Sequence, residues 1–313
     1  MTHPILPGVT AGAFLRRLAV IVAVSICSSA ADAQTLFAVS VRTFADPSYK
    51  GLEGSLYRVD PASGVTVLVA PLRLDGRDSI GLDGLAIHPK TGEVFGVTSP
   101  TIGPIPHSLV RVDSATGFVT LLGDLGASGS DVSFDPDGTL YMWLPRTSQI
   151  GTVDTGAAKI TSVGAPRPAT ANEGGISATS GVVALVAPSG GAGTLDSIDL
   201  KTGAVIASVQ MKGAPYAELM AGLAEAPDGT LFGVNTNGGT PALAELVKID
   251  KRTGQVTPIG PLPHDTNSIA FGPAVVAEKG WDLNQWRVLL FPIFLVIGAG
   301  LVAAFALSKR RGH

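Results

Sequence analysis

The chain has 313 residues, of which 15% are charged and 39 are glycine, and its formal net charge is −3. This composition excludes a helical bundle and is typical of an all-β protein with many tight turns. No basic stripe with interleaved aromatic residues is present, which argues against nucleic-acid binding. The single cysteine, Cys27, lies in a segment expected to be removed, so disulfides, cysteine-bound zinc and a cysteine nucleophile are not expected.

The N-terminal segment, residues 1–33, predicts a secretory signal peptide. Arg16 and Arg17 precede a short apolar run over residues 18–26, and small residues that a signal peptidase recognises stand just before Gln34. The alternative is an N-terminal membrane anchor, which the short apolar run disfavours because hydrocarbon is roughly 30 Å thick. The general secretory and twin-arginine export routes both stay open.

An internal repeat comes next, and its first phrase is a strand, an aspartate, a turn ending in Ser/Thr-Gly and a second strand. Successive aspartates of this phrase are 41 to 53 residues apart, the length of one four-stranded propeller blade. The copies span 55–69, 108–122, 149–163, 194–208 and 245–259, with the aspartates Asp60, Asp113, Asp154, Asp199 and Asp250.

A second phrase alternates with the first and consists of a short apolar strand, a turn with glycine that usually contains proline, and another strand. Its copies span 84–98, 131–144, 175–186 and 222–235. Together the two phrases give four strands per unit. One such unit cannot cover both of its own faces, and stacking units around an axis solves that problem.

The ends of the repeat predict how the ring closes. Residues 35–41 match the second strand of a unit, and residues 268–273 supply its missing first strand. We therefore expect a five-bladed β-propeller over residues 34–277, with one blade built from both termini so that no sheet edge is left free. A six-bladed ring and an open form are the alternatives.

The repeat phrases also carry a resemblance to known proteins. The stretches FDPDGTLY at 134–141, YRVDPASG at 57–64 and VKIDKRTG at 247–254 resemble the β-propeller superfamily of NHL-type, gluconolactonase-like and quinoprotein-like propellers. The resemblance covers residues 35–273. It implies the fold and says little about activity, because the same repeat hosts unrelated chemistries.

The C-terminal region predicts a membrane anchor. Residues 288–307 are 20 residues without a charge, and a basic tail follows over 308–313. A juxtamembrane linker over 278–287 contains Trp281 and Trp286, which suit a membrane interface. We expect an exported protein held in the inner membrane, with its propeller in the periplasm or on the cell exterior. A buried core helix is the alternative, and cleavage of the helix as a sorting segment stays open.

The repeat aspartates are expected to accept hydrogen bonds from turn amides rather than to bind cations. The same holds for Asp135 and Asp228, because no distal glutamate completes a calcium-binding loop there. The histidines His88, His107 and His264 lie in turns or loops without metal-binding spacing, and they are expected to be loop residues.

Polar side chains gather just before the first strand of each unit, where a propeller channel opens at one mouth. Gluconolactonase-like propellers hold calcium with Asp, Glu and Asn from such positions, and the resemblance makes Asp83, Glu173 and Asn267 the metal candidates. Against this, Ser130 and Ala221 stand at the matching positions of two blades. The alternative is a polar, water-filled mouth. The full set is Asp83, Asp131, Asn172, Glu173, Glu218, Asp265 and Asn267.

The favoured functional interpretation is a binding or scaffold module for a protein, peptide or glycan, without assigned catalytic residues or cofactor. The alternative is a calcium-dependent, lactonase-like hydrolase with its site at the channel mouth. A purely structural surface protein is a third possibility. A glycosidase is disfavoured because Trp143 is the only tryptophan in the repeat region, whereas sugar-binding grooves are usually rich in aromatic residues.

Overall fold

The chain was analysed as a computed structural model, and every regular element it describes is a β-strand. Among the described residues no helix is long and apolar enough to cross a membrane. The predicted signal peptide, linker and C-terminal helix lie outside these residues and stay predictions. The described residues are 34–41, 54–76, 78–99, 104–169, 173–189, 193–217, 219–239 and 241–272.

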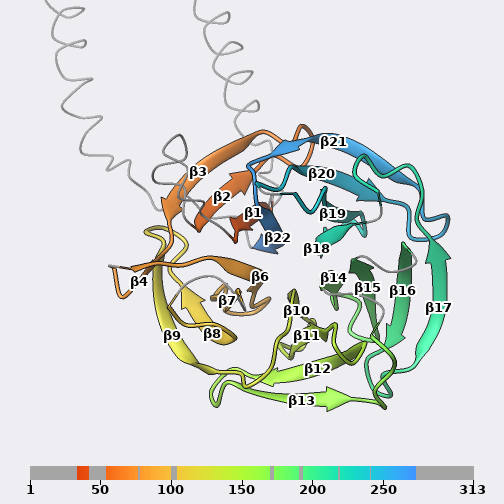
Figure 1. Cartoon of the computed structure of the whole chain (residues 1–313), viewed down its shortest axis with the longest axis horizontal. Coiled ribbons are helices and arrows are strands. Elements are labelled where there is room, and N and C mark those ends of the chain that lie inside the picture. Colours follow the sequence, from red (N-terminus) through yellow and green to blue (C-terminus); the bar gives the residue numbers. More distant parts are fainter. Residues whose placement is uncertain are drawn as a thin grey trace, which may run out of the picture. The chain divides into compact units, whose positions relative to one another are not determined.

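Five sheets surround a central axis, which confirms the five-bladed propeller (Figure 1). From the axis outward, blade 1 contains β22 (Thr266–Gly272), β1 (Thr35–Ser40), β2 (Ser55–Val59) and β3 (Thr66–Pro71); blade 2 contains β6 (Leu82–Ile87), β7 (Val94–Thr98), β8 (Ser108–Val112) and β9 (Phe118–Asp124); blade 3 contains β10 (Val132–Phe134), β11 (Leu140–Leu144), β12 (Gln149–Asp154) and β13 (Lys159–Val163); blade 4 contains β14 (Glu173–Ser177), β15 (Val183–Ser189), β16 (Thr194–Asp199) and β17 (Val205–Gln210); blade 5 contains β18 (Met220–Glu225), β19 (Leu231–Thr236), β20 (Ala244–Ile249) and β21 (Val256–Leu262).

Blade 2 carries one addition that the repeat phrases did not predict. The connection from blade 1 forms β4 (Arg73–Leu74) and β5 (Asp78–Ser79). Strand β4 pairs in parallel with β9, so this short hairpin extends the sheet beyond its fourth strand. It covers part of an edge that would otherwise be open.

Blade 1 is closed by the two ends of the propeller, as the sequence predicted. Strand β22 pairs antiparallel with β1, and Ala38 lies opposite Ile269. The pairing joins residues more than 200 positions apart and completes the ring without a covalent link at that point. It therefore leaves no blade with an unpaired neighbour.

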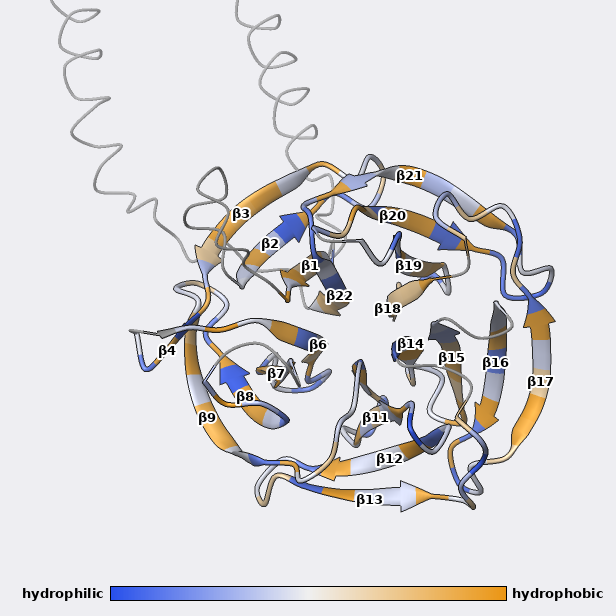
Figure 2. Ribbon diagram, in the orientation of Figure 1, coloured by the Kyte–Doolittle hydropathy of each residue, from blue (hydrophilic) through white to orange (hydrophobic). Residues whose placement is uncertain are grey.

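The hydrophobic core lies between the blades, and hydrophobic residues recur in every blade (Figure 2). Phe95 of blade 2 and Phe134 of blade 3 belong to one buried cluster, and their rings meet edge to face with centroids 5.5 Å apart. Second strands such as β7 and β11 are wholly buried, whereas the outer strand β17 is mostly exposed. Burial thus falls with distance from the axis, as stacking of two-faced sheets requires.

Glycine lets the inner strands approach one another closely. Gly84, Gly175 and Gly222 occupy the same position of the repeat, on β6, β14 and β18. A Cβ atom on Gly222 would lie 2.8 Å from the carbonyl oxygen of Asn267 and from the Cα atom of Ser268. These are backbone contacts, so the neighbouring strand must move if a side chain is added.

We expect Gly222→Ala to lower the free energy of unfolding by about 1–3 kcal/mol, the usual penalty for overpacking a core. Gly233→Ala on β19 is the matched control, because its Cβ atom would meet only side-chain atoms, at 3.1 Å or more. Denaturant titration of both variants measures the difference. Equal stability of the two variants would contradict the close approach of β18 and β22.

Candidate functional site at the ring axis

Asp131 and Ser268 form a hydrogen-bonded node at the axis that joins all five inner strands. Asp131 precedes β10, and its Oδ2 accepts the backbone N–H groups of Ile176 and Leu223, both at 3.1 Å. The Ser268 hydroxyl donates to Asp131 Oδ1 at 2.6 Å and accepts the N–H of Leu85 at 2.9 Å. Blades 2, 4 and 5 thus bind to side chains contributed by blades 3 and 1.

The node is buried, and burial governs its charge. Asp131 is fully enclosed, and removal from water raises its pKa to about 7, although the hydroxyl of Ser268 and the backbone donors oppose the rise. Every donor aims at a carboxylate oxygen. Asp131 was a candidate for the channel mouth in the sequence; the structure instead places it inside the ring, where its oxygens are used by the protein.

The polar mouth, defined here as Asp83, Glu173 and Asn267, lies at the end of the axis where the inner strands begin. Asn267 donates from Nδ2 to Asp83 Oδ1 at 3.2 Å. Asp83 is only 6% exposed, whereas Glu173 reaches solvent. The structure thus brings Asp83 and Asn267, from blades 2 and 1, into contact, and Glu173 of blade 4 lies close enough to act on Asp83 electrostatically.

Both carboxyl groups of the polar mouth hold their protons more tightly than usual. Burial raises the pKa of Asp83 well above its ordinary value, and the nearby charges of Glu173 and Asp131 add to the rise. The hydrogen bond from Asn267 opposes it. Burial also raises the pKa of Glu173. A cation or a hydrogen-bond donor at this mouth would relieve the repulsion between these groups.

The remaining mouth candidates have other surroundings. Asp265 accepts the N–H of Ala242 at 2.9 Å, so its side chain holds the β19–β20 connection. The Ser130 hydroxyl donates to the carbonyl of Gly174 at 2.7 Å, which links blades 3 and 4. Asn172 and Glu218 lie outside the described residues. Among the side chains that the structure describes, no three of the His, Cys, Asp and Glu type are grouped to suit a metal.

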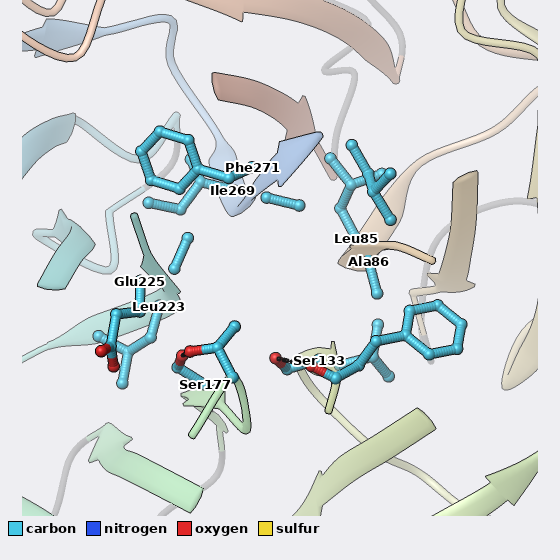
Figure 3. A pocket seen from close by; sticks show the side chains of 14 residues that line it. Leu85, Ala86, Ser133, Ser177, Leu223, Glu225, Ile269 and Phe271 are labelled. Carbon is cyan, nitrogen blue, oxygen red and sulfur yellow. Dashed lines mark hydrogen bonds between the residues drawn. The ribbon is translucent and has the colours of Figure 1, made fainter. Parts of the chain in front are cut away.

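A second opening, called here the apolar funnel, lies at the opposite end of the axis. Its outer cavity measures about 330 Å³, and a narrower extension of about 50 Å³ runs inward between the strands. Leu85, Leu223 and Ile269 line the extension together with the hydroxyls of Ser133 and Ser177 (Figure 3). The outer cavity is lined by Gln34, Ile87, Pro89, Phe134, Asp135, Pro136, Thr179, Glu225, Ala226, Pro227 and Phe271.

The sequence did not predict the funnel, because its wall residues have the pattern of core strands. Ile87, Phe134, Glu225 and Phe271 occupy the same repeat position on four inner strands. Glu225 is the acidic member of this set, and Lys251 neutralises it at 2.9 Å. An acidic residue at an otherwise apolar position was the signal that could have found the site.

The turn residues behave as the sequence predicted. Each repeat aspartate accepts backbone N–H groups two and three residues ahead or, in Asp60, an N–H and a hydroxyl; Asp250, for example, accepts from Arg252 at 2.8 Å and Thr253 at 2.9 Å. These backbone donors lower the pKa of Asp250. His88 caps its own turn through Nδ1, at 3.2 Å from the Lys90 nitrogen. These groups serve hairpins away from the axis.

Comparison with known proteins finds similarity of fold. No family model matches the chain, and no curated protein is similar to it in sequence. At the level of fold it resembles propellers of the laminin-binding, gluconolactonase and lyase types.

Three solved structures illustrate this range. A hydrazine synthase of Kuenenia stuttgartiensis is 18% identical, with a TM-score of 0.39 over 59% of this chain and 49% of its own, so this chain spans about half of that protein. A chain of a nidogen/laminin complex is 12% identical, with a TM-score of 0.47 over 77% and 98%. A gluconolactonase of Xanthomonas campestris is 13% identical, with a TM-score of 0.44 over 68% and 71%.

The raised pKa of Asp131 makes a prediction about stability and pH. Its pKa is about 7 in the folded chain and near 3.8 when unfolded, so the folded state binds more protons between these values. The contribution of Asp131 to stability is therefore present at low pH and lost as pH rises through about 7, with a slope of up to about 1.4 kcal/mol per pH unit.

We expect Asp131→Asn to keep the node and flatten this pH dependence, because its amide can accept from Ile176 and Leu223 and donate to Ser268. Asp131→Ala leaves two buried amides without an acceptor, so we expect a loss of about 3 kcal/mol or more at pH 5. Urea denaturation between pH 4.5 and 8 measures both effects. The assignment is wrong if the Asn variant keeps the full pH slope of the parent chain.

Proposed function

We propose that the chain is an exported, membrane-anchored binding or scaffold module that holds a protein, peptide or glycan partner at the face of the polar mouth. The observation that carries this proposal is the unequal length of the connections on the two faces. At the polar mouth the β1–β2 connection has 14 residues and the β7–β8 connection has nine. At the funnel face the hairpins have only four to six residues.

Long connections on a rigid scaffold are where binding function concentrates. The scaffold here is rigid because the node cross-links its inner strands and the blades bury their faces against one another. The node also separates the two mouths, so a partner at one face is not read by the other. The anchor rests on residues 288–307, and export rests on residues 1–33.

A photo-crosslinking pair tests the face. Ala127 is exposed in the connection before β10, on the polar-mouth face, and Ala115 is exposed in the β8–β9 hairpin on the opposite face. With a photoreactive amino acid at each position of the full chain in its native membrane, we expect one discrete adduct from position 127 and none from position 115. Equal adducts from both positions, or adducts from 115 alone, would refute a binding face at the polar mouth.

The anchor has its own control. A chain ending at residue 287 should leave the membrane fraction, whereas the full chain should resist extraction at alkaline pH. A full chain that is extracted as easily as the shortened one would refute the anchor and leave the binding face untouched.

A calcium-dependent hydrolase is the second candidate, and one observation favours it. Asp83, Glu173 and Asn267 bring oxygen atoms from three blades to one mouth, and oxygen is the ligand that Ca²⁺ requires. The fit is partial, because three side chains supply fewer than the six to eight oxygens of a full shell, and water must supply the rest. When bound, the ion would polarise an ester carbonyl, and Asp83 and Glu173 would hold it.

Calorimetry with Ca²⁺ tests this candidate. Asp83 must lose its proton to bind, and its pKa is raised, so we expect affinity to increase as pH rises from 6 to 8. Asp83→Asn should weaken binding at least about tenfold, the common penalty for removing a charged ligand partner. The control is Asp113→Asn, which alters an exposed turn aspartate. Absence of heat at millimolar Ca²⁺ would exclude the hydrolase.

A further inference from the structure

The rim of the apolar funnel is complete on four blades and open on the fifth. In blades 2, 3 and 5 the turn after the inner strand places a proline at the rim, namely Pro89, Pro136 and Pro227, and blade 4 contributes Thr179. Blade 1 has no such turn, because its first two strands are the two ends of the propeller. There the cavity is lined by Phe271 and Gln34, from which the chain leaves and enters.

The register of the repeat carries the departing chain along the same path. Phe271-Gly272-Pro273 aligns with Ile87-His88-Pro89 and with Phe134-Asp135-Pro136. The prolines of blades 2, 3 and 5 all line the cavity, so the segment after Pro273 starts at the rim position that a turn occupies elsewhere. This segment begins with Ala274-Val275-Val276-Ala277, called here the apolar tetrapeptide, and continues with the charged pair Glu278-Lys279.

The chemistry of the cavity matches that of the tetrapeptide. Its wall is built on Ile87, Phe134 and Phe271, with the charge of Glu225 already neutralised by Lys251. Burial of a valine side chain in such a wall stabilises by roughly 1.5 kcal/mol or more. Four extended residues reach at most about 14 Å, which spans a cavity of this size from its own edge.

Covalent attachment favours this occupant over any free one. A segment joined to the rim by a short linker is present at an effective concentration in the millimolar range, so weak apolar contacts suffice to hold it. A separate partner would have to displace it. Docking of this kind needs only β22 and its continuation, and it does not depend on the membrane anchor or on the binding face.

We propose that residues 274–277 fold back over the apolar funnel and place their valines in its cavity, supplying to blade 1 the rim that a turn supplies to the other blades. The funnel is then a docking site for a segment of the same chain. The polar mouth stays the end of the axis that is open to other molecules.

Disulfide trapping in the full chain tests the docking. Cys27→Ser removes the native thiol, and Thr179→Cys with Val276→Cys places one cysteine on the exposed rim and one in the tetrapeptide. We expect mild oxidation to give an intrachain bond, detected by mass spectrometry of tryptic peptides. The control pairs Val276→Cys with Ala127→Cys on the opposite face and should give none.

Two outcomes overturn the proposal directly. A bond that forms only between two chains would assign the funnel to a second copy of the protein. A bond that forms equally in the test and control pairs, or in neither, would show that the tetrapeptide does not prefer the funnel.

A third substitution separates docking from simple proximity. Adding Val275→Asp to the test pair puts a charge against the apolar wall, and we expect the bond to form about tenfold more slowly. Glu278→Ala is the matched control outside the tetrapeptide and should leave the rate unchanged. Equal rates for the Asp variant and the parent pair would mean that the tether alone brings the cysteines together.

Discussion

The structure depends on how the free edges of five inner strands are satisfied at one axis. Each inner strand pairs with a neighbour on one side only, so its other edge presents backbone N–H groups toward the centre, where unpaired groups are costly. Leu85, Ile176 and Leu223 each follow a glycine of the axial layer, and their N–H groups bind to Ser268 or Asp131. Two polar side chains thus replace the strand that a closed barrel would supply.

The same arrangement explains why three of the five axial positions are glycine. The layer contains Gly84, Gly175 and Gly222, and with only two side chains present, Asp131 and Ser268 can reach across the axis. Strands close enough to share these acceptors leave no room for a Cβ atom beside the next backbone. Close approach and central hydrogen bonding are therefore one constraint, and the burial of a carboxylate is its electrostatic consequence.

Much of the fold could be predicted because the repeat is written in local chemistry. The aspartate turns, such as that of Asp250, encode each hairpin, and the match between residues 35–41 and the inner pairs of other blades predicted the closure by β22. The axial layer could not be predicted in the same way. Asp83 and Asp131 are one repeat position apart, and neighbouring strand residues point to opposite sides.

That single step separates a mouth residue from a buried one, and irregular pairing makes it harder to count. The register of β6 against β7 shifts between Leu82 and Gly84, next to Asp83, and β18 shifts between Met220 and Gly222. The funnel escaped for a related reason, since Ile87 and Phe134 have the pattern of residues packed in a core. Long-range placement of three or more blades, rather than local pattern, decides whether such residues line a cavity or fill it.

Sealing the axis gives the two mouths opposite electrostatic characters. At the polar mouth the negative charges of Glu173 and Asp131 both raise the pKa of Asp83, and a hydrogen bond from Asn267 is the main favourable contact of its carboxylate. At the funnel the acidic group Glu225 is paired with Lys251, and the wall is otherwise apolar. A partner with donors or positive charge gains at the first mouth by relieving a strain that the fold itself creates, whereas an apolar segment gains at the second only through burial. The blades supply both surfaces from the same repeat positions, so the ring distinguishes its two ends by a few side chains and not by its architecture.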